Sequence, residues 1–178
     1  MDKAVLADID LLVQLRLDYL KEDYQEYDVE EMAEIERQLP DYFHRHLGKD
    51  LFCYVAREGE DIVSCALLLV VEKPMNPSFI NGKTGTVFNV YTKPSFRRKG
   101  YAKKIMSDLI KDAEEMKLSV VDLKSTEMGY PLYASIGFKD VQSHYHEMKW
   151  TNKHLKRDTL ILVLEKSANT IISEKDSI

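Results

Sequence analysis

Five residues in one short stretch have the types and the spacing of an anion-binding site. Gly100 precedes an amphipathic helical pattern, and Arg97, Arg98, Lys99 and Lys103 surround it. A helix N-terminus presents backbone N–H groups without intrahelical partners, and a glycine lets a ligand approach the backbone closely. Guanidinium groups bind phosphate oxygens through parallel hydrogen bonds. This stretch therefore predicts a site for a diphosphate.

The basic stretch differs from the common nucleotide-binding motifs and stands out from the rest of the chain. Neither G-x-x-x-x-G-K-[ST] nor G-x-G-x-x-G occurs. The 178 residues carry a formal net charge of -5, whereas nucleic-acid binders are usually basic. We therefore expect the site to bind a small ligand, and we expect no nucleic-acid partner.

The residues on either side of this turn predict a strand, a helix and a second strand. Four of the five residues 87–91 are β-branched or aromatic, and Pro94 stops strand pairing. Residues 102–117 carry apolar side chains at intervals of three and four, which predicts a helix with one buried face. Residues 119–124 form the next strand, and a connection of this length implies a right-handed crossover between parallel neighbours.

Three motifs in this order resemble the GNAT superfamily of acyl-CoA N-acyltransferases. Residues 97–102 (RRKGYA) match its [RQ]-x-x-G-x-[GA] pyrophosphate motif, and residues 90–94 (VYTKP) lie where the family's splayed strand ends. Residues 132–138 (LYASIGF) match its LYxxxGF turn. The resemblance implies an α/β fold of three layers, in which helices flank a central mixed, splayed β-sheet. It implies a domain over residues 1–150 and a C-terminal extension over residues 151–178.

The resemblance also implies acetyl-CoA as co-substrate and direct transfer of its acetyl group to a primary amine in a ternary complex. The backbone at the end of the splayed strand would bind the pantetheine and stabilise the thioester oxygen. Many relatives carry a cofactor-binding asparagine near Thr126, where threonine keeps a hydroxyl but loses the amide. The implied cofactor-binding residues are Val90, Tyr91, Thr92, Arg97, Arg98, Lys99, Gly100, Tyr101, Ala102, Lys103 and Thr126.

Tyr133 is the implied catalytic residue, because the family assigns protonation of the leaving thiolate to the tyrosine of this turn. A phenol with a pKa near 10 and a thiol with a pKa near 8.5 are close enough for a hydrogen bond to help. An alkylamine is only about 0.1% neutral at pH 7, so a base must remove its proton. Asp122, Glu127, Glu72 or a chain of water molecules would serve as that base.

These motifs are compatible with either a small-molecule or a peptide amine as acceptor. The acidic net charge slightly favours a cationic amine. The alternative function is that of a non-catalytic acyl-CoA-binding or regulatory module that kept the cofactor site. No metal-ligand spacing surrounds Cys53 and Cys65, so we expect no metal, and we expect both to be reduced thiols in the core.

The N-terminal half predicts two helices and a hairpin. Asp8 is placed to cap a first helix. The resemblance implies a strand before this helix, and since only residues 3–6 remain for it, that strand is expected to be short or missing. A second helix over residues 29–47 is divided or kinked at Pro40. Its His44 and His46 lie beside aromatic residues and are expected to pack or face solvent. Two strands follow, residues 51–57 and 62–71, and a loop covers residues 72–86.

The C-terminal half predicts a short helix ended by Gly137 and a closing antiparallel pair of strands, residues 138–142 and 144–150. The longest apolar runs, residues 65–71 and 160–164, are too short to cross a bilayer, which takes about 20 residues. The first residues lack the pattern of a secretory signal. We therefore expect a cytoplasmic protein without a membrane partner. The run 160–164 is expected to pack on its own domain or on a second subunit, which would make a homodimer.

Overall fold

The centre of the molecule is a sheet of five strands in the order β1-β2-β3-β4-β5. The structure is a computed structural model that describes residues 2–24 and 26–152. The first four strands are antiparallel and β5 runs parallel to β4, so the sheet is mixed as predicted. The strands are β1 (Asp2–Lys3), β2 (Leu51–Glu58), β3 (Asp61–Glu72), β4 (Lys83–Thr92) and β5 (Val120–Leu123).

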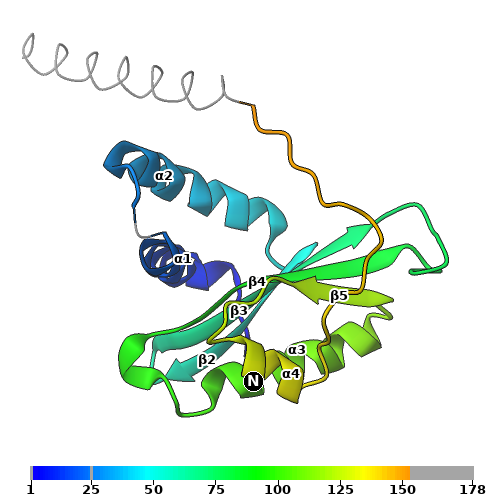
Figure 1. Cartoon of the computed structure of the whole chain (residues 1–178). Coiled ribbons are helices and arrows are strands. Elements are labelled where there is room, and N and C mark those ends of the chain that lie inside the picture. The colour runs from blue at the N-terminus through cyan, green and yellow to red at the C-terminus, as the bar shows by residue number, and fades with distance from the viewer. Residues whose placement is uncertain (1, 25, 153–178) are drawn as a thin grey trace, which may run out of the picture.

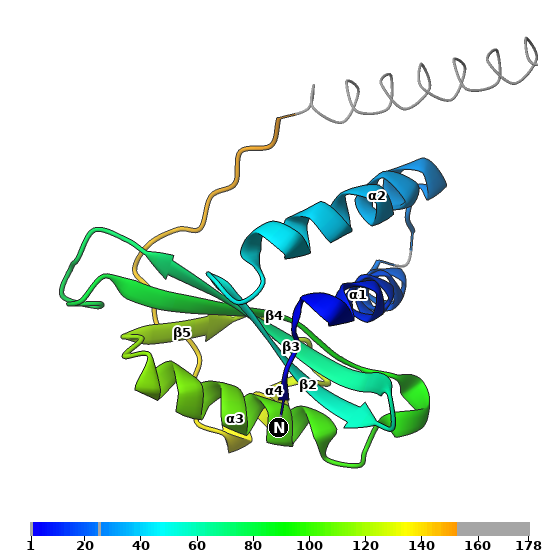
Figure 2. The ribbon, with the colours of Figure 1, turned by 180° about the vertical axis from the view of Figure 1, so that it is seen from behind.

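Helices cover both faces of this sheet (Figure 1). The helices are α1 (Ile9–Asp23), α2 (Val29–His46), α3 (Tyr101–Glu115) and α4 (Tyr130–Ser135), with single turns of 3-10 helix at η1 (Leu6–Asp8) and η2 (Pro94–Phe96). The view from behind shows α1 and α2 on one face and α3 on the other (Figure 2). The chain therefore has the predicted three-layer α/β architecture.

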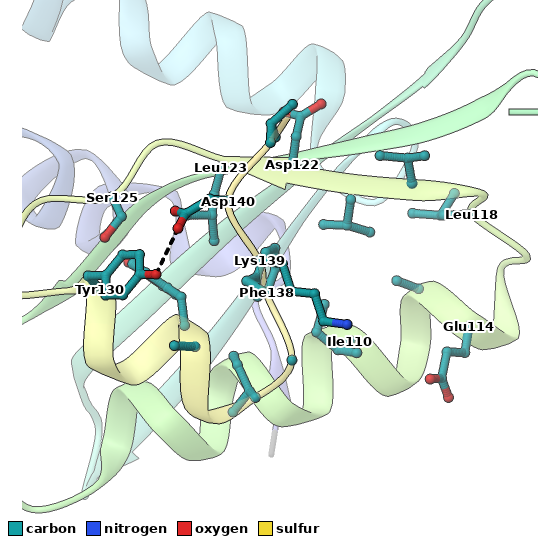
Figure 3. A pocket seen from close by; sticks show the side chains of 18 residues that line it. Ile110, Glu114, Leu118, Asp122, Leu123, Ser125, Tyr130, Phe138, Lys139 and Asp140 are labelled. Carbon is teal, nitrogen blue, oxygen red and sulfur yellow. Dashed lines mark hydrogen bonds between the residues drawn. The ribbon is translucent and has the colours of Figure 1, made fainter. Parts of the chain in front are cut away.

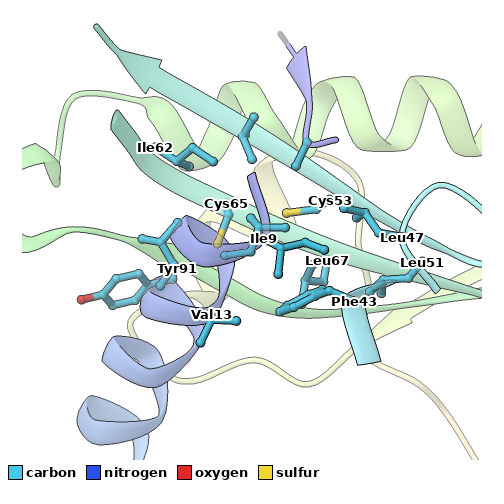
Figure 4. Close-up of a cluster of buried hydrophobic side chains, with 14 of the residues drawn as sticks. Ile9, Val13, Phe43, Leu47, Leu51, Cys53, Ile62, Cys65, Leu67 and Tyr91 are labelled. Carbon is cyan, nitrogen blue, oxygen red and sulfur yellow. The ribbon is translucent and has the colours of Figure 1, made fainter. Parts of the chain in front are cut away.

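Side chains that alternate along the strands fill a core on each side of the sheet. Cys53, Val55 and Leu67 join Leu15 of α1 and Phe43 of α2 in one buried cluster (Figure 4). The residues that alternate with them along β2 and β3 point to the other face, where they join residues of β4 and α3. This second cluster consists of Tyr54, Ala56, Val63, Ala66, Leu68, Val87, Ile105, Met106 and Leu109. Two buried faces explain why β2 and β3 are nearly continuous apolar runs.

Several predicted elements are confirmed. The hairpin β2–β3, the helix α3 and the parallel strand β5 all form, and the first strand is only two residues long. Cys53 and Cys65 are buried and free. The second helix runs through Pro40 as one element, so the proline does not divide it.

The loop predicted over residues 72–86 is too long, because β4 begins at Lys83. Gly85 was interpreted as a loop residue, but it pairs with Val70 and Val121 inside the sheet. A Cβ atom there would lie 2.7 Å from a methyl carbon of Leu68. Gly85 is therefore needed because side chains of the neighbouring strands lie close to it, rather than for a turn.

The closing pair predicted over residues 138–150 is wrong, since these residues form no strand. Val141, Met148 and Trp150 are each at least 84% exposed, and β5 pairs with β4 alone among the described strands. Polar and apolar residues are mixed on both sides of this segment, so its pattern specifies no register against a sheet edge. The prediction for residues 160–164 lies outside the described residues. No described helix is long and apolar enough to cross a membrane.

Asp8 occupies the position before α1, but its carboxylate does not cap that helix. It accepts hydrogen bonds from the backbone N–H of Val5 (2.8 Å) and from Arg57 Nη2 (2.7 Å). The hydrogen bond from Arg57 outweighs burial and lowers the pKa of Asp8 below its ordinary value. Asp8 thereby ties the N-terminal turn to β2.

We expect Asp8→Asn to lower the free energy of unfolding at pH 7 by about 1–3 kcal/mol, because a buried charge-assisted hydrogen bond is lost. A lowered pKa means that this stabilisation is present above the ordinary aspartate pKa and disappears as the pH falls through the folded-state value. Urea unfolding from pH 7 to pH 2 should therefore show the variant and the wild type converging in acid. The exposed Asp10→Asn is the control, and a constant difference at all pH values would contradict the role of Asp8.

Candidate active site

The strand β4 extends beyond the end of β5 at the centre of the molecule. The two strands pair where residues 84–87 face residues 120–123, and β4 continues to Thr92 without a partner in β5. A cleft of about 800 Å³ lies beside this unpaired part of β4, between α1, β4 and the loop after β5. Four residues selected from the sequence line it: Val90, Asp122, Thr126 and Tyr133.

A β-bulge in β4 borders the cleft. The register of β3 against β4 shifts between Cys65 and Leu67, and Asn89 has a φ angle of +53°. Asparagine tolerates this left-handed conformation better than other residues with a Cβ atom. Its buried side-chain amide donates to Cys65 Sγ (3.5 Å), and its oxygen accepts from Arg16 Nη1 (3.0 Å). These contacts hold the bulge in place, and neither Asn89 nor Arg16 was selected from the sequence.

Tyr133 lies on α4 at the edge of the cleft. Its ring packs edge-on against Phe138, with ring centres 6.1 Å apart. Burial raises the pKa of Tyr133, and no charge in the described part of the chain adds to that shift. The hydroxyl therefore stays protonated at neutral pH and can donate a hydrogen bond into the cleft.

Gly100 has the geometry that the anion-site prediction requires. It is the residue before α3 and has a φ angle of +85°, and a Cβ atom added to it would meet nothing within 4 Å. The surrounding space is open, so the free N–H groups of the first helical turn are accessible to a ligand. The side chains of Arg98, Lys99 and Lys103 are exposed beside it.

Arg97 is held by contacts within the protein. Its Nη2 lies 2.5 Å from Glu22 Oε2 on α1, and its Nε donates to the carbonyl of Thr92 at 2.9 Å. Glu22 also accepts a hydrogen bond from the Tyr91 hydroxyl at 2.7 Å. Arg97 therefore anchors the basic turn to α1 through its side chain.

The other predicted cofactor-binding residues differ in what their side chains offer. Tyr91 is 6% exposed and packs in the core on the α1 side, and the Thr92 hydroxyl bonds Ser64. The side chains of Tyr91 and Thr92 are therefore not available to a ligand in the cleft, and any contact would be made by their backbone. The Thr126 hydroxyl accepts from the backbone N–H of Gly129 (3.2 Å), which leaves its own proton free to be donated. Tyr101 and Ala102 begin α3, and the Tyr101 hydroxyl bonds Glu58.

Among the three carboxylates considered as general base, only Asp122 lines the cleft. Neither Glu72 nor Glu127 does. Asp23 and Glu147 line it as well, and neither was considered from the sequence. His46 is as expected a packing residue, since its ring lies 4.6 Å from that of Tyr42 and bonds Asp50.

A second hollow, of about 780 Å³, lies between α3, β5 and α4 (Figure 3). A hydrogen bond of 3.0 Å from Tyr130 to Asp140 bridges its side, and Tyr133 and Asp122 belong to both hollows. Tyr133 thus stands between two adjoining spaces. Within the described ranges, no three histidine, cysteine, aspartate or glutamate side chains are grouped so as to hold a metal ion.

Comparison with known proteins agrees with this architecture. The model of the acetyltransferase (GNAT) family matches residues 10–138, so the chain belongs to the GNAT acetyltransferase family. No curated protein matches the sequence. Solved structures, in contrast, do match this chain. A predicted acetyltransferase from Clostridium acetobutylicum, crystallised with acetyl-CoA, is 28% identical with a TM-score of 0.73, and the match covers 83% of this chain and 94% of that one.

Two further structures show the same fold. A GCN5-related N-acetyltransferase from Ralstonia eutropha is 26% identical with a TM-score of 0.69, over 83% of this chain and 96% of that chain. Glucosamine-6-phosphate N-acetyltransferase from Arabidopsis thaliana is 19% identical with a TM-score of 0.60, over 83% and 95%. At that identity the last match supports the fold alone.

We expect Gly100→Asp to weaken acetyl-CoA binding by roughly tenfold or more, because it adds a like charge beside the diphosphate and fills the space above the helix N-terminus. Gly48→Asp is a matched control, since Gly48 also has a positive φ angle (+78°) and open space around it. Both variants should lose about 1 kcal/mol of stability through backbone strain. Titration calorimetry measures the affinity, and equal affinities in the two folded variants would refute the assignment.

Proposed function

We propose that the protein is an N-acetyltransferase that transfers the acetyl group of acetyl-CoA to a primary amine by direct attack in a ternary complex. The observation that carries this proposal is the convergence of three features at one cleft: the edge of β4 left unpaired beyond β5, the bulge at Asn89, and Tyr133 at the cleft edge. Membership in the GNAT family and the likeness to a structure with acetyl-CoA support it.

The basic turn would hold the diphosphate. The N–H groups at the start of α3 can donate to phosphate oxygens beside Gly100, and the exposed Arg98, Lys99 and Lys103 add positive charge. Arg97 would act differently, by fixing the turn against Glu22. The cofactor's diphosphate would thus be bound mainly by backbone groups and flexible cations.

The open edge of β4 would bind the pantetheine arm. Residues 90–92 lie beyond the last pair of β4 with β5. Backbone groups alternate between the two edges of a strand, so Val90 and Thr92 would donate at this open edge, whereas Tyr91 pairs with Cys65 of β3. When acetyl-CoA is bound, it supplies a thioester that an amine can attack with loss of the thiolate. A fixed N–H near the thioester oxygen stabilises the negative charge that develops on it without reorganisation.

Tyr133 would donate a hydrogen bond to the departing sulfur. Its raised pKa keeps the hydrogen on the phenol, so hydrogen bonding rather than complete proton transfer is its role. Asp122, directly or through water, would accept the proton of the amine, because it lines the cleft where Glu72 and Glu127 do not. No metal takes part in this scheme.

The catalytic domain is proposed to span residues 1–150, with residues 151–178 as an extension. The family match ends at residue 138, inside that boundary. We propose that the enzyme works in the cytoplasm on a small-molecule or peptide amine. A thiol-release assay over a panel of amines tests the activity, and acetyl-CoA binding without turnover of any amine would favour the binding module instead.

We expect Tyr133→Phe to lower kcat by roughly 100-fold, the lower end of what positioned acid catalysis contributes. The ring and its contact with Phe138 remain, so melting temperature and acetyl-CoA affinity should stay unchanged. The acceptor KM should move little, since the lost interaction acts mainly in the transition state. Steady-state kinetics and calorimetry measure these quantities. Wild-type turnover in the variant would show that Tyr133 is structural.

A further inference from the structure

We propose that Arg16 binds a carboxylate group of the acceptor, so that the substrate is an amino acid or another amine with a carboxylate a few bonds from its nitrogen. This inference rests on the proposed acetyl transfer and names the class of amine. It assigns a specificity role to a residue of α1 that neither the motifs nor the proposed mechanism uses.

Arg16 is placed to meet an acceptor in the cleft. It is half-buried on α1 and lines the same cleft as Val90, Asp122 and Tyr133. Its Nη1 donates to Asn89 Oδ1 at 3.0 Å. Asn89 directly precedes Val90, where the thioester is proposed to lie. A ligand on Arg16 would therefore be close to the reacting carbonyl carbon.

The charge of Arg16 is not neutralised within the protein. Other half-buried cations have carboxylate partners: Arg57 lies 2.7 Å from Asp8, and Lys93 lies 2.6 Å from Asp61. In the part of the chain that the structure describes, Arg16 forms no ion pair, and its one hydrogen-bond partner is a neutral amide oxygen. A guanidinium has five N–H donors, so most of those of Arg16 remain for a ligand. Keeping a cation partly out of water without a counter-ion is unfavourable unless a ligand supplies one.

Two aromatic rings hold the guanidinium in the cleft. Its central carbon lies 5.5 Å from the ring centre of Tyr19 and 5.9 Å from that of Phe88. These contacts, with the hydrogen bond to Asn89, limit the rotation of the side chain. A guanidinium fixed in this way presents its donor pair to the two oxygens of a carboxylate with little further loss of entropy.

The remaining charges of the cleft suit a zwitterion. Asp23 on α1 accepts a hydrogen bond from Tyr19, whereas Asp122, Lys124 and Glu147 belong to the side formed by β5 and the segments after it. An amino acid could place its carboxylate on Arg16 and its ammonium group toward Asp122. An amine without a carboxylate would instead leave Arg16 without a counter-ion. The local charge, rather than the acidic net charge, would therefore decide acceptor preference.

The test compares acceptors that share a side chain. Leucine, leucinamide and 3-methylbutylamine form one set, and phenylalanine, phenylalaninamide and phenethylamine form a second. The inference predicts that kcat/KM for the acid exceeds that for its amide by roughly 10- to 100-fold in at least one set, as expected for a hydrogen-bonded charge pair. The long 6-aminohexanoic acid should be poor. Acids and amides that react equally well would overturn the inference while leaving acetyl transfer intact.

Substitution then identifies the residue. Arg16→Gln should reduce the acid-to-amide ratio of kcat/KM by the same 10- to 100-fold, and Arg16→Lys should retain part of it. A purely structural role would lower both rates together and leave the ratio unchanged, which would overturn the assignment. Arg45→Gln is the control, since Arg45 is exposed on α2 and its side chain donates to a carbonyl of its own helix. If acetyl-CoA binds but no amine reacts, the proposed function fails, and this inference fails with it.

Discussion

The unpaired edge of β4 beyond the end of β5 is the constraint on which the rest of the structure depends. Two parallel strands that stay paired have no free backbone groups between them, and a ligand cannot enter. Here β5 ends at Leu123 while β4 continues to Thr92, and the bulge at Asn89 lies within the unpaired part of β4. The helix α1 lies on one side of this opening and α4 lies on the other.

Polar contacts support this opening, whereas the core of the protein is apolar. Leu15, Phe43 and Ile105 are almost fully buried and stabilise the layers, but they do not define the site. The bulge is held by hydrogen bonds of Asn89 to Cys65 and to Arg16 at the wall of the cleft. Buried polar groups of this kind must be satisfied, and the arrangement that satisfies them is specific.

Local patterns were sufficient to predict most of the fold. The apolar alternation of residues 51–71 and the helical spacing of residues 102–116 depend on neighbours in sequence, and both elements form as predicted. The position of Gly85 in a strand is not predicted, because its reason is a close contact with side chains of neighbouring strands. The mixed pattern of residues 138–150 predicts strands, although a strand also requires a partner edge, which no local pattern can supply.

The site was only partly predictable for the same reason. Gly100 and Tyr133 lie within short motifs, so their positions could be found by inspection. The pair of Arg16 and Asn89 joins residues 73 positions apart and depends on a left-handed backbone angle in β4. The signals available beforehand were a cation within the apolar stripe of α1 and an asparagine within a strand-forming run, and each has ordinary explanations when considered alone.

The contact of Arg97 with Glu22 has a consequence for how the protein responds to its surroundings. Both side chains are at least 40% exposed, so their attraction contributes about 0–1 kcal/mol and is screened by dissolved ions. The hydrogen bond from Tyr91 to the same carboxylate is less exposed and carries no formal charge on its donor. Raising the ionic strength therefore weakens the contact between the basic turn and α1, while the packing of α1 on the sheet is unaffected. The strength of this one contact thus depends on the salt content of the medium, whereas the hydrogen bond from Arg97 to the Thr92 carbonyl remains.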